Sequence, residues 1–219
     1  GFKKKLESNF GTYNHWIYRA MKNENKGNYL EVGPGGCELL NNFKKRGWRC
    51  EGFELSKWIK SKNVFHDIKK ITKNNKDILV FNDVLEHTVD PIKILKRFSK
   101  FQKKGSKLFI AYPNSSSLKA KILKTRWPML APLAHLNFFS IDSSKILLKE
   151  CGYHPITIKE TSFVIFRKLI RNILRLPITI TLDIRNFRML KAIKRIEEVF
   201  LNIFDLIKGD QMNIIGIKK

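Results

Sequence analysis

Short apolar runs alternate with amphipathic stretches over most of the chain. Each apolar run ends near glycine, proline, asparagine or an acidic residue, which is typical of buried strands that end in turns. The stretches between them place apolar residues at helical spacing. This alternation predicts an α/β fold in which helices cover both faces of a mostly parallel sheet. The predicted strands span residues 28–33, 49–54, 63–66, 77–82, 107–112, 154–160 and 211–217.

Helices are predicted between these strands. A helix over residues 91–101 begins with proline in its first turn, and one over residues 141–151 is followed by Gly152 as a C-terminal cap. Two further helices are predicted over residues 37–46 and about 7–22. With 219 residues, of which 43% are hydrophobic, the chain is long enough for one substantial core but short for two.

The alternation breaks between residues 161 and 208. Apolar residues there recur at helical spacing, and ten basic residues stand against four acidic ones. Two basic amphipathic helices are therefore predicted, which suit an anionic membrane surface or a partner, or else cover the sheet with their apolar faces. The single predicted domain comprises an N-terminal helix (1–27), a core (28–160), this helical insertion (161–208) and a final strand (209–219).

The net charge is strongly positive. Forty-three lysines and arginines against 19 aspartates and glutamates give +24, with a pI of about 10.1. Such a charge indicates attraction to nucleic acid, a membrane surface or an acidic substrate. The lysines are scattered among many asparagines and isoleucines, so a bias in composition is the alternative explanation.

The spacing of the cysteines and the short length of the longest uncharged stretch favour a cytoplasmic protein. Three cysteines, at positions 37, 50 and 151, form neither a CxxC pair nor a zinc-ligand spacing. The longest uncharged stretch, residues 127–141, has fifteen residues and two prolines. A membrane helix needs about 20 residues, so we predict an apolar, aromatic loop there instead.

A glycine-rich turn follows the first predicted strand. Residues 29–40 read YLEVGPGGCELL, so the strand runs through Glu31 into Gly33, Pro34, Gly35 and Gly36. Backbone can approach a ligand closely in such a turn. The GK[ST] of a P-loop is absent, and an acid stands where the third glycine of GxGxxG belongs. These departures disfavour nucleoside triphosphates and nicotinamide cofactors, and they favour an adenosine ligand without phosphates.

Acidic residues mark the ends of the next three strands. Glu54 follows the second strand, 21 residues after Gly33, where a carboxylate can accept both ribose hydroxyls. Asp67 follows the third strand and is placed to reach an adenine edge. The fourth strand ends in FNDVLEH, which brings Asn82 and Asp83 to the edge where open α/β sheets bind ligands.

These segments together resemble the class I S-adenosylmethionine-dependent methyltransferases, and within them the branch of quinone-biosynthesis and sugar O-methyltransferases. The resemblance extends over residues 29–160 and the final strand, and it implies a doubly wound Rossmann-like sheet of seven strands with the last strand antiparallel. One departure is Cys37 in place of the usual third glycine. The segments that carry the resemblance are LEVGPGG, GFELS, FHD, NDVLEHTVDPIKIL, YPN and HLNFFSIDSSKILLKECGY.

The resemblance also implies which residues hold the donor, S-adenosylmethionine. The glycine turn holds its methionine part, the acid after the second strand its ribose, and the aspartate after the third strand its adenine. Carried onto this sequence, the cofactor-binding residues are Glu31, Gly33, Gly35, Glu54, Leu55, Asp67, Ile68, Asn82 and Asp83.

Two histidines are candidates for the acceptor side. Methyl transfer to a hydroxyl benefits from a general base, and histidine titrates near neutrality. His87 follows the fourth strand, and His135 lies in the apolar loop. The alternatives are that His87 caps a turn beside Asp90 and that His135 is packed within the loop.

The same loop supplies candidate acceptor contacts. Trp127, Phe138 and Phe139 form an apolar wall if the loop folds over the sheet edge, or they seal the core. Asn114, after the fifth strand, contacts the acceptor or holds a turn. No metal site is predicted, because Asp83, Glu86 and Asp90 have no clear further partner.

The predicted acceptor is a hydroxyl of a small molecule, a sugar or a lipid-linked precursor. Nucleic acid is not expected, because the place of an (N/D)PP(Y/F) base-methylation motif reads NDVL and no cysteine follows strands four or five. RNA methylation and a non-catalytic donor-binding module are the alternatives. Residues 161–208 provide a peripheral contact with the anionic inner membrane face if their basic helices bind lipid.

Overall fold

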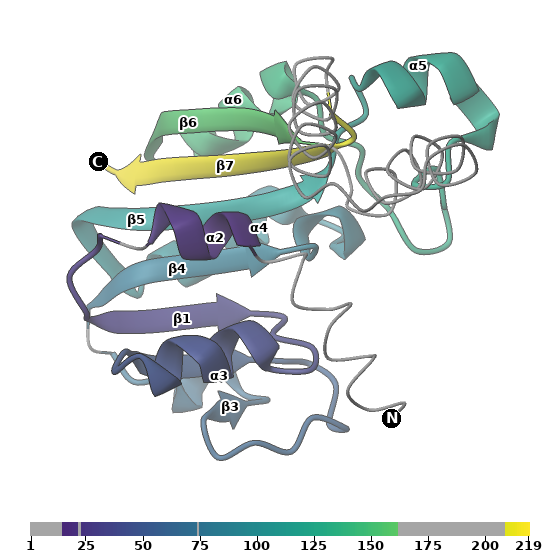
Figure 1. The fold of residues 1–219 in the computed structure, drawn as a ribbon. Coiled ribbons are helices and arrows are strands. Elements are labelled where there is room, and N and C mark those ends of the chain that lie inside the picture. Colours follow the sequence, from purple (N-terminus) through teal and green to yellow (C-terminus); the bar gives the residue numbers. More distant parts are fainter. Residues whose placement is uncertain (1–14, 22, 74, 162–208) are drawn as a thin grey trace, which may run out of the picture.

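Seven strands of the described residues form one sheet in the order β3-β2-β1-β4-β5-β7-β6 (Figure 1). The computed structural model describes residues 15–21, 23–73, 75–161 and 209–219. Every predicted strand lies within two residues of its predicted ends except for the start of the fifth. The strands are β1 (Asn28–Val32), β2 (Arg49–Phe53), β3 (Val64–Phe65), β4 (Lys76–Asn82), β5 (Gln102–Pro113), β6 (Tyr153–Thr161) and β7 (Gln211–Lys218).

The sheet is parallel except at one side. Strands β1 to β5 pair in parallel, whereas β7 lies antiparallel between β5 and β6. The predicted fold class, with an antiparallel last strand, is confirmed. Because β1, β2, β3 and β4 run in the same direction, their carboxyl ends share one edge, where the predicted site residues follow them.

Helices cover both faces of the sheet (Figure 1). Helix α4 begins after Asp90, whose side chain accepts a hydrogen bond from the Lys93 amide at 2.8 Å. A reciprocal pair of serine caps starts α6. Helix α5 was not predicted, and only the end of the predicted 7–22 helix is described. The helices are α2 (His15–Ala20), α3 (Glu38–Lys45), α4 (Pro91–Ser99), α5 (Leu118–Leu123) and α6 (Ile141–Glu150).

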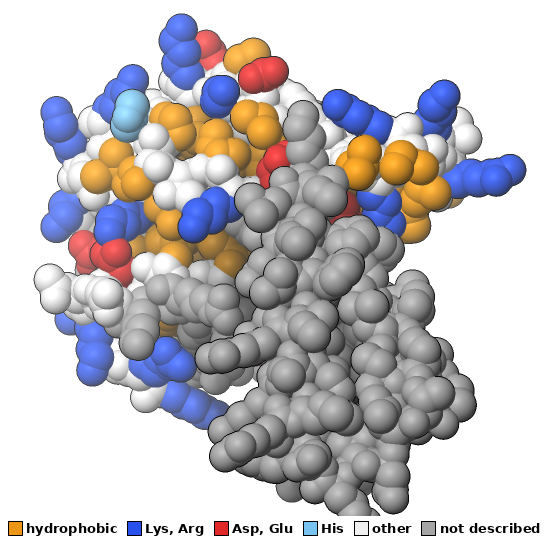
Figure 2. Space-filling model, turned by 45° about the horizontal axis from the view of Figure 1, so that its top comes forward, with side chains coloured by type: hydrophobic (Ala, Val, Ile, Leu, Met, Phe, Trp, Pro, Cys, Tyr) orange, Lys and Arg blue, Asp and Glu red, His pale blue; other side chains and the backbone are white. Residues whose placement is uncertain are grey.

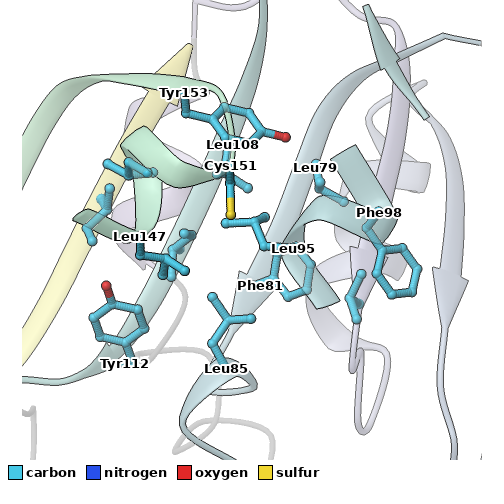
Figure 3. Close-up of a cluster of buried hydrophobic side chains, with 14 of the residues drawn as sticks. Leu79, Phe81, Leu85, Leu95, Phe98, Leu108, Tyr112, Leu147, Cys151 and Tyr153 are labelled. Carbon is cyan, nitrogen blue, oxygen red and sulfur yellow. The ribbon is translucent and has the colours of Figure 1, made fainter. Parts of the chain in front are cut away.

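The strand alternation builds a separate apolar layer on each face. Leu79 and Phe81 of β4 point into the cluster shown in Figure 3, where Leu95 and Leu147 come from α4 and α6. The intervening Ile78 and Val80 of β4 belong to the cluster beneath α2 and α3. Burial of both layers fixes the register of each parallel strand, because a one-residue slip would exchange the two layers.

A lysine is buried within the sheet. Lys76, at the start of β4, is 1% exposed, and its ammonium group pairs with the carboxylate of Glu51 in β2. The Thr72 hydroxyl donates to the same carboxylate at 2.8 Å and accepts from the lysine at 3.1 Å. The strand starts one residue before its predicted start at residue 77, and the charge of Lys76 is paired rather than solvated.

No helix among the described residues is long and apolar enough to span a bilayer. The predicted amphipathic insertion lies outside the described residues, which resume at residue 209. On the face drawn in Figure 2, lysine and arginine side chains are spread around the rim and between apolar ones. Their spread favours the compositional explanation of the charge for this part of the surface.

Candidate active site

The glycine turn after β1 has the conformation that its sequence predicts. Gly33 and Gly35 have φ values of 69° and 48°, in the left-handed region that favours glycine. The Gly33 amide donates to the carbonyl of Phe53 at 2.8 Å, and a Cβ at Gly33 would lie 2.6 Å from Cγ2 of Val84. A Cβ at Gly35 would meet no atom of the described residues within 4 Å. The turn is thus closed on the side of β4 and open at Gly35.

Cys37, which replaces the usual third glycine, is also left-handed. Its φ of 60° and ψ of 20° place it immediately before α3, with no side-chain cap. Cysteine in place of glycine at position 37 therefore strains the backbone, since a residue with a side chain pays about 1–2 kcal/mol to adopt the left-handed conformation.

We expect Cys37→Gly to be more stable than Cys37→Ala by about 1 kcal/mol. Both variants lack the buried thiol, so the comparison isolates the backbone preference. Urea unfolding of the two proteins measures the difference. Equal midpoints with equal slopes would show that this turn relaxes without strain.

Glu31 lies inside β1 and is buried. Its Oε2 accepts a hydrogen bond from the Tyr29 hydroxyl at 3.0 Å, and the Leu40 amide of α3 also donates to its carboxylate. Burial raises its pKa to about 7, although both hydrogen bonds act in the opposite direction. The described contacts of Glu31 therefore tie the strand before the turn to the helix after it.

The raised pKa of Glu31 predicts a pH-dependent stability. A carboxyl group that binds its proton more tightly in the folded state does not lower the free energy of unfolding at pH values below its unfolded pKa of 4.5. As the pH rises further, it lowers the free energy of unfolding more and more, until the pH passes about 7. Between about pH 5.5 and about pH 7.5 the ligand-free protein should lose about 2 kcal/mol relative to Glu31→Gln. Chemical unfolding of both proteins across this range measures it, and parallel pH profiles would contradict the prediction.

The acids after β2 and β3 lie at the predicted edge. Glu54 is half-buried, with Oε1 accepting from the Ser56 amide at 3.0 Å, whereas the neighbouring Leu55 is 79% exposed. Asp67 is exposed and caps a short 3-10 helix by accepting from the Lys69 amide at 2.9 Å. The next residue, Ile68, packs against the core. Because β2 and β3 are adjacent and parallel, both acids stand at neighbouring strand ends.

The end of β4 presents a polar pair. Asn82 donates from Nδ2 to Oδ2 of Asp83 at 3.0 Å, while its buried Oδ1 has no hydrogen-bond partner among the described residues. Asp83 has a φ of 53°. Burial raises its pKa to about 6, opposed chiefly by the nearby His87. The unpaired Oδ1 is an acceptor at the carboxyl edge, and a buried acceptor without a partner calls for a ligand or water donor.

The structure brings the two candidate histidines together. His87 and His135 are 48 positions apart in the chain, yet their ring centroids are 4.8 Å apart. Their Nδ1 atoms lie 2.7 Å from the carbonyl oxygens of Ala134 and Met129, respectively. A carbonyl oxygen only accepts, so each Nδ1 donates its hydrogen, and Nε2 is the atom that carries the lone pair whenever the ring is neutral.

Glu86 lies beside them and is almost completely buried. Its Oε1 is 3.9 Å from Nε2 of His87, and in the described part of the chain its Oε2 has no hydrogen-bond partner. Burial raises its pKa to about 8, and the charge of Asp83 adds to this effect. Its backbone carbonyl accepts from the amides of Leu136 and Asn137, at 2.7 and 3.0 Å. These two bonds hold the apolar loop against the end of β4.

The predicted acceptor contacts divide into buried and exposed side chains. Trp127 and Phe139 are 5% and 6% exposed, and Phe139 stacks on Tyr112 with ring centroids 4.1 Å apart. Phe138 is 39% exposed. Phe139 therefore follows the alternative that it seals the core, whereas Trp127 is buried beside Phe138 and Phe138 retains a surface for an acceptor.

Asn114 is fully buried and uses its side chain within the protein. Its Nδ2 donates to Glu160 at 2.6 Å and to the Gly209 carbonyl at 2.9 Å, and its Oδ1 accepts from the Ser116 amide at 3.0 Å. These bonds link the end of β5 to β6 and to Gly209, which precedes β7. They support the turn-holding alternative for this residue.

Comparison with known proteins identifies the family. The methyltransferase domain profile matches residues 6–158, most of the chain. The chain belongs to this methyltransferase family. The predicted methyltransferase enzyme is confirmed at this level, while its branch and acceptor are not established by the match.

Solved methyltransferases share the fold. A SAM-dependent methyltransferase from Archaeoglobus fulgidus has a TM-score of 0.59 at 18% identity, over 99% of both chains. One from Thermotoga maritima has a TM-score of 0.61 at 14% identity, over 100% of this chain and 95% of that one. Phosphoethanolamine N-methyltransferase 2 from Haemonchus contortus, in complex with S-adenosyl-L-methionine, has a TM-score of 0.57 at 14% identity, over 95% of this chain and 52% of that one. No curated protein sequence matches this methyltransferase.

A hollow in this methyltransferase lies away from the site. It has a volume of about 340 Å³ and is lined by residues at the amino ends of β4 and β5, including Asp77, Lys103 and Lys104. The predicted site residues lie at the opposite ends of the strands. The hollow therefore has no part in the chemistry described below.

Proposed function

We propose that this methyltransferase transfers a methyl group from S-adenosylmethionine to a hydroxyl of a small molecule, a sugar or a lipid-linked precursor. The donor supplies an electrophilic methyl group on a positively charged sulfur. The protein must hold the acceptor oxygen in line with that methyl group and exclude water.

The residues at the sheet edge fit this donor. The turn is open at Gly35, where backbone rather than a side chain faces a ligand. Glu54 provides a half-buried carboxylate at the end of β2 for ribose hydroxyls. Asn82 provides a buried oxygen that no other described residue pairs by a hydrogen bond. We assign Glu31 to shaping the turn through its bonds to Tyr29 and α3.

Further donor contacts follow from the strand ends. Asp67 and Ile68 stand after β3 at the expected adenine side, and exposed Leu55 follows the ribose acid. Gly33 lies against the side chain of Val84, the residue that follows Asp83. In this proposal the adenosyl group lies along the edge from β3 to β4.

The single observation that carries the choice of a hydroxyl acceptor is the histidine pair. Both Nδ1 atoms are bonded to backbone carbonyls, so both Nε2 atoms can accept a proton beside the end of β4. In the reaction, an oxygen lone pair forms the new C–O bond as the C–S electron pair moves onto sulfur. The hydroxyl proton passes to one Nε2, and the products are a methyl ether and S-adenosylhomocysteine.

A lipid-linked acceptor would bring the enzyme to a membrane. Exposed Leu118 and Ile122 on α5 lie among basic residues of the same helix, and residues 161–208 are basic and amphipathic in sequence. Binding to anionic vesicles at low salt, lost at high salt, would support peripheral association at the inner membrane face. Protein that ignores such vesicles at low salt would restrict the acceptor to a soluble compound.

Calorimetry followed by a transfer assay tests the proposed function. S-Adenosylmethionine and S-adenosylhomocysteine should each bind once per chain, and radiolabelled methyl groups should pass into an alkali-stable ether in a small-molecule or lipid extract. Absence of binding would refute the proposal. Label that enters only RNA would replace the acceptor class, and binding without transfer to a broad panel of acceptors would favour a non-catalytic module.

A further inference from the structure

The two histidines and Glu86 form a cluster whose ligand atoms face one another. One carboxylate oxygen of Glu86 and one ring nitrogen from each of His87 and His135 all lie within 4.8 Å of one another. Two imidazoles and a carboxylate bind zinc in metalloproteases and ferrous iron in non-haem oxygenases. We propose that these three residues bind one divalent transition-metal ion.

The orientation of both rings supports the assignment. A histidine that binds a metal usually donates its other ring N–H to a carbonyl or carboxylate, which fixes the tautomer and the ring direction. Both rings have this arrangement, with Nδ1 of each 2.7 Å from a backbone carbonyl oxygen. The Nε2 atoms of His87 and His135 are therefore prepared as ligands before any ion arrives.

Glu86 provides an independent observation. It is 1% exposed, yet its Oε2 has no hydrogen-bond partner within the described part of the chain. A buried carboxylate oxygen without a partner is costly, and a cation removes that cost. The amides of Leu136 and Asn137 donate to the Glu86 carbonyl, so the segment that carries His135 is fastened to the segment that carries the acid.

Small side-chain rotations complete the geometry. Ligand atoms about 2.1 Å from a tetrahedral ion lie about 3.4 Å apart. The distance between His87 Nε2 and Glu86 Oε1 is 3.9 Å, and all ligand atoms of the cluster lie within 4.8 Å of one another. The His87 side chain is 43% exposed, so it has room to turn and leaves a path by which an ion can enter.

The role of the ion rests on the proposed function. Three protein ligands leave a coordination position that an acceptor oxygen can take. An ion there would favour loss of the hydroxyl proton to water, after which the oxygen attacks the methyl carbon and the C–S pair moves to sulfur. In the metal-loaded enzyme, His87 and His135 are then ligands rather than bases.

Direct metal binding tests the site without any assay of methyl transfer. Chelator-stripped protein, free of a histidine tag, is titrated with Co²⁺ and Zn²⁺. The content is measured by mass spectrometry and the Co²⁺ visible spectrum is recorded. We expect one ion per chain and a spectrum of nitrogen and oxygen ligands. His87→Ala, His135→Ala and the isosteric Glu86→Gln should each weaken Co²⁺ binding by at least about tenfold. His154→Ala, which removes an exposed histidine on β6, should leave it unchanged.

The outcomes separate this proposal from the proposed function. Lack of binding by the wild-type protein, or equal binding by a folded His87→Ala/His135→Ala double variant, overturns the metal site. Metal bound in a protein that fails to bind S-adenosylmethionine supports the site and refutes the proposed function. Methyl transfer that is unchanged after chelation, in protein shown to be metal-free, overturns the role of the ion in the reaction.

Discussion

Gly33→Val is expected to weaken binding of S-adenosylmethionine by roughly a hundredfold or more, about 3 kcal/mol. The native φ of 69° is unfavourable for a β-branched side chain, and the new Cβ would approach Cγ2 of Val84 to 2.6 Å. The turn must then leave the conformation in which its backbone faces the donor. Calorimetric titration with the donor, on protein whose folding is verified by circular dichroism, measures the effect.

Gly105→Val is the matched control for this variant. Gly105 also has a left-handed φ, of 84°, but it lies in β5 away from the site and a Cβ there meets nothing within 4 Å. It should lower stability through the same backbone strain and leave donor affinity unchanged. If both variants lost donor binding equally, general destabilisation rather than the turn would explain the result.

Glu51→Gln is expected to destabilise the protein by about 4 kcal/mol. It removes the carboxylate charge that faces the buried ammonium group of Lys76, while the shape of the side chain is retained. A buried ion whose counter-charge is removed keeps its desolvation cost and loses the attraction that compensates for it. The midpoint and slope of urea unfolding at neutral pH measure the loss.

The paired variant Glu51→Leu/Lys76→Met provides the control. It replaces both charges with apolar groups, so it should recover most of the stability that Glu51→Gln loses. The pair links β2 to the start of β4, so both variants test what holds this region together. A double variant as unstable as Glu51→Gln would mean that specific hydrogen bonds, rather than charge balance, hold this region.

The strand and helix order could be predicted because both faces of the sheet are buried. Leu79 and Phe81 serve one layer while Ile78 and Val80 serve the other, so β4 reads as a continuous apolar run. The start of β5 could not be placed, because residues 102–106 are mostly polar. They join the strand through pairing of Gln102 with Lys76 across a register shift. Lys76 itself resembles a strand boundary in sequence, since lysine is seldom buried without a partner.

The candidate site was predicted in its parts but not in its arrangement. The acids and glycines follow strands whose direction is set by the fold, so their common edge could be inferred. The contact between His87 and His135 depends on how the loop after α5 returns to the end of β4. That return is set by the bonds from Leu136 and Asn137 to the Glu86 carbonyl. Hydrogen bonds between backbone groups do not depend on which side chains are present, so the sequence gives no sign of them. Neither the contact between the two histidines nor their proximity to Glu86 could therefore be predicted from the sequence.

The position of β7 between β5 and β6 has a consequence for synthesis of the protein. The last strand along the chain fills the space between two strands made much earlier, and it pairs with both. Until residues 211–218 leave the ribosome, β5 and β6 each present an unsatisfied hydrogen-bonding edge to other nascent chains. Completion of this sheet is therefore a late event, and ribosome-bound intermediates of this enzyme should be good clients for chaperones that cover exposed strands.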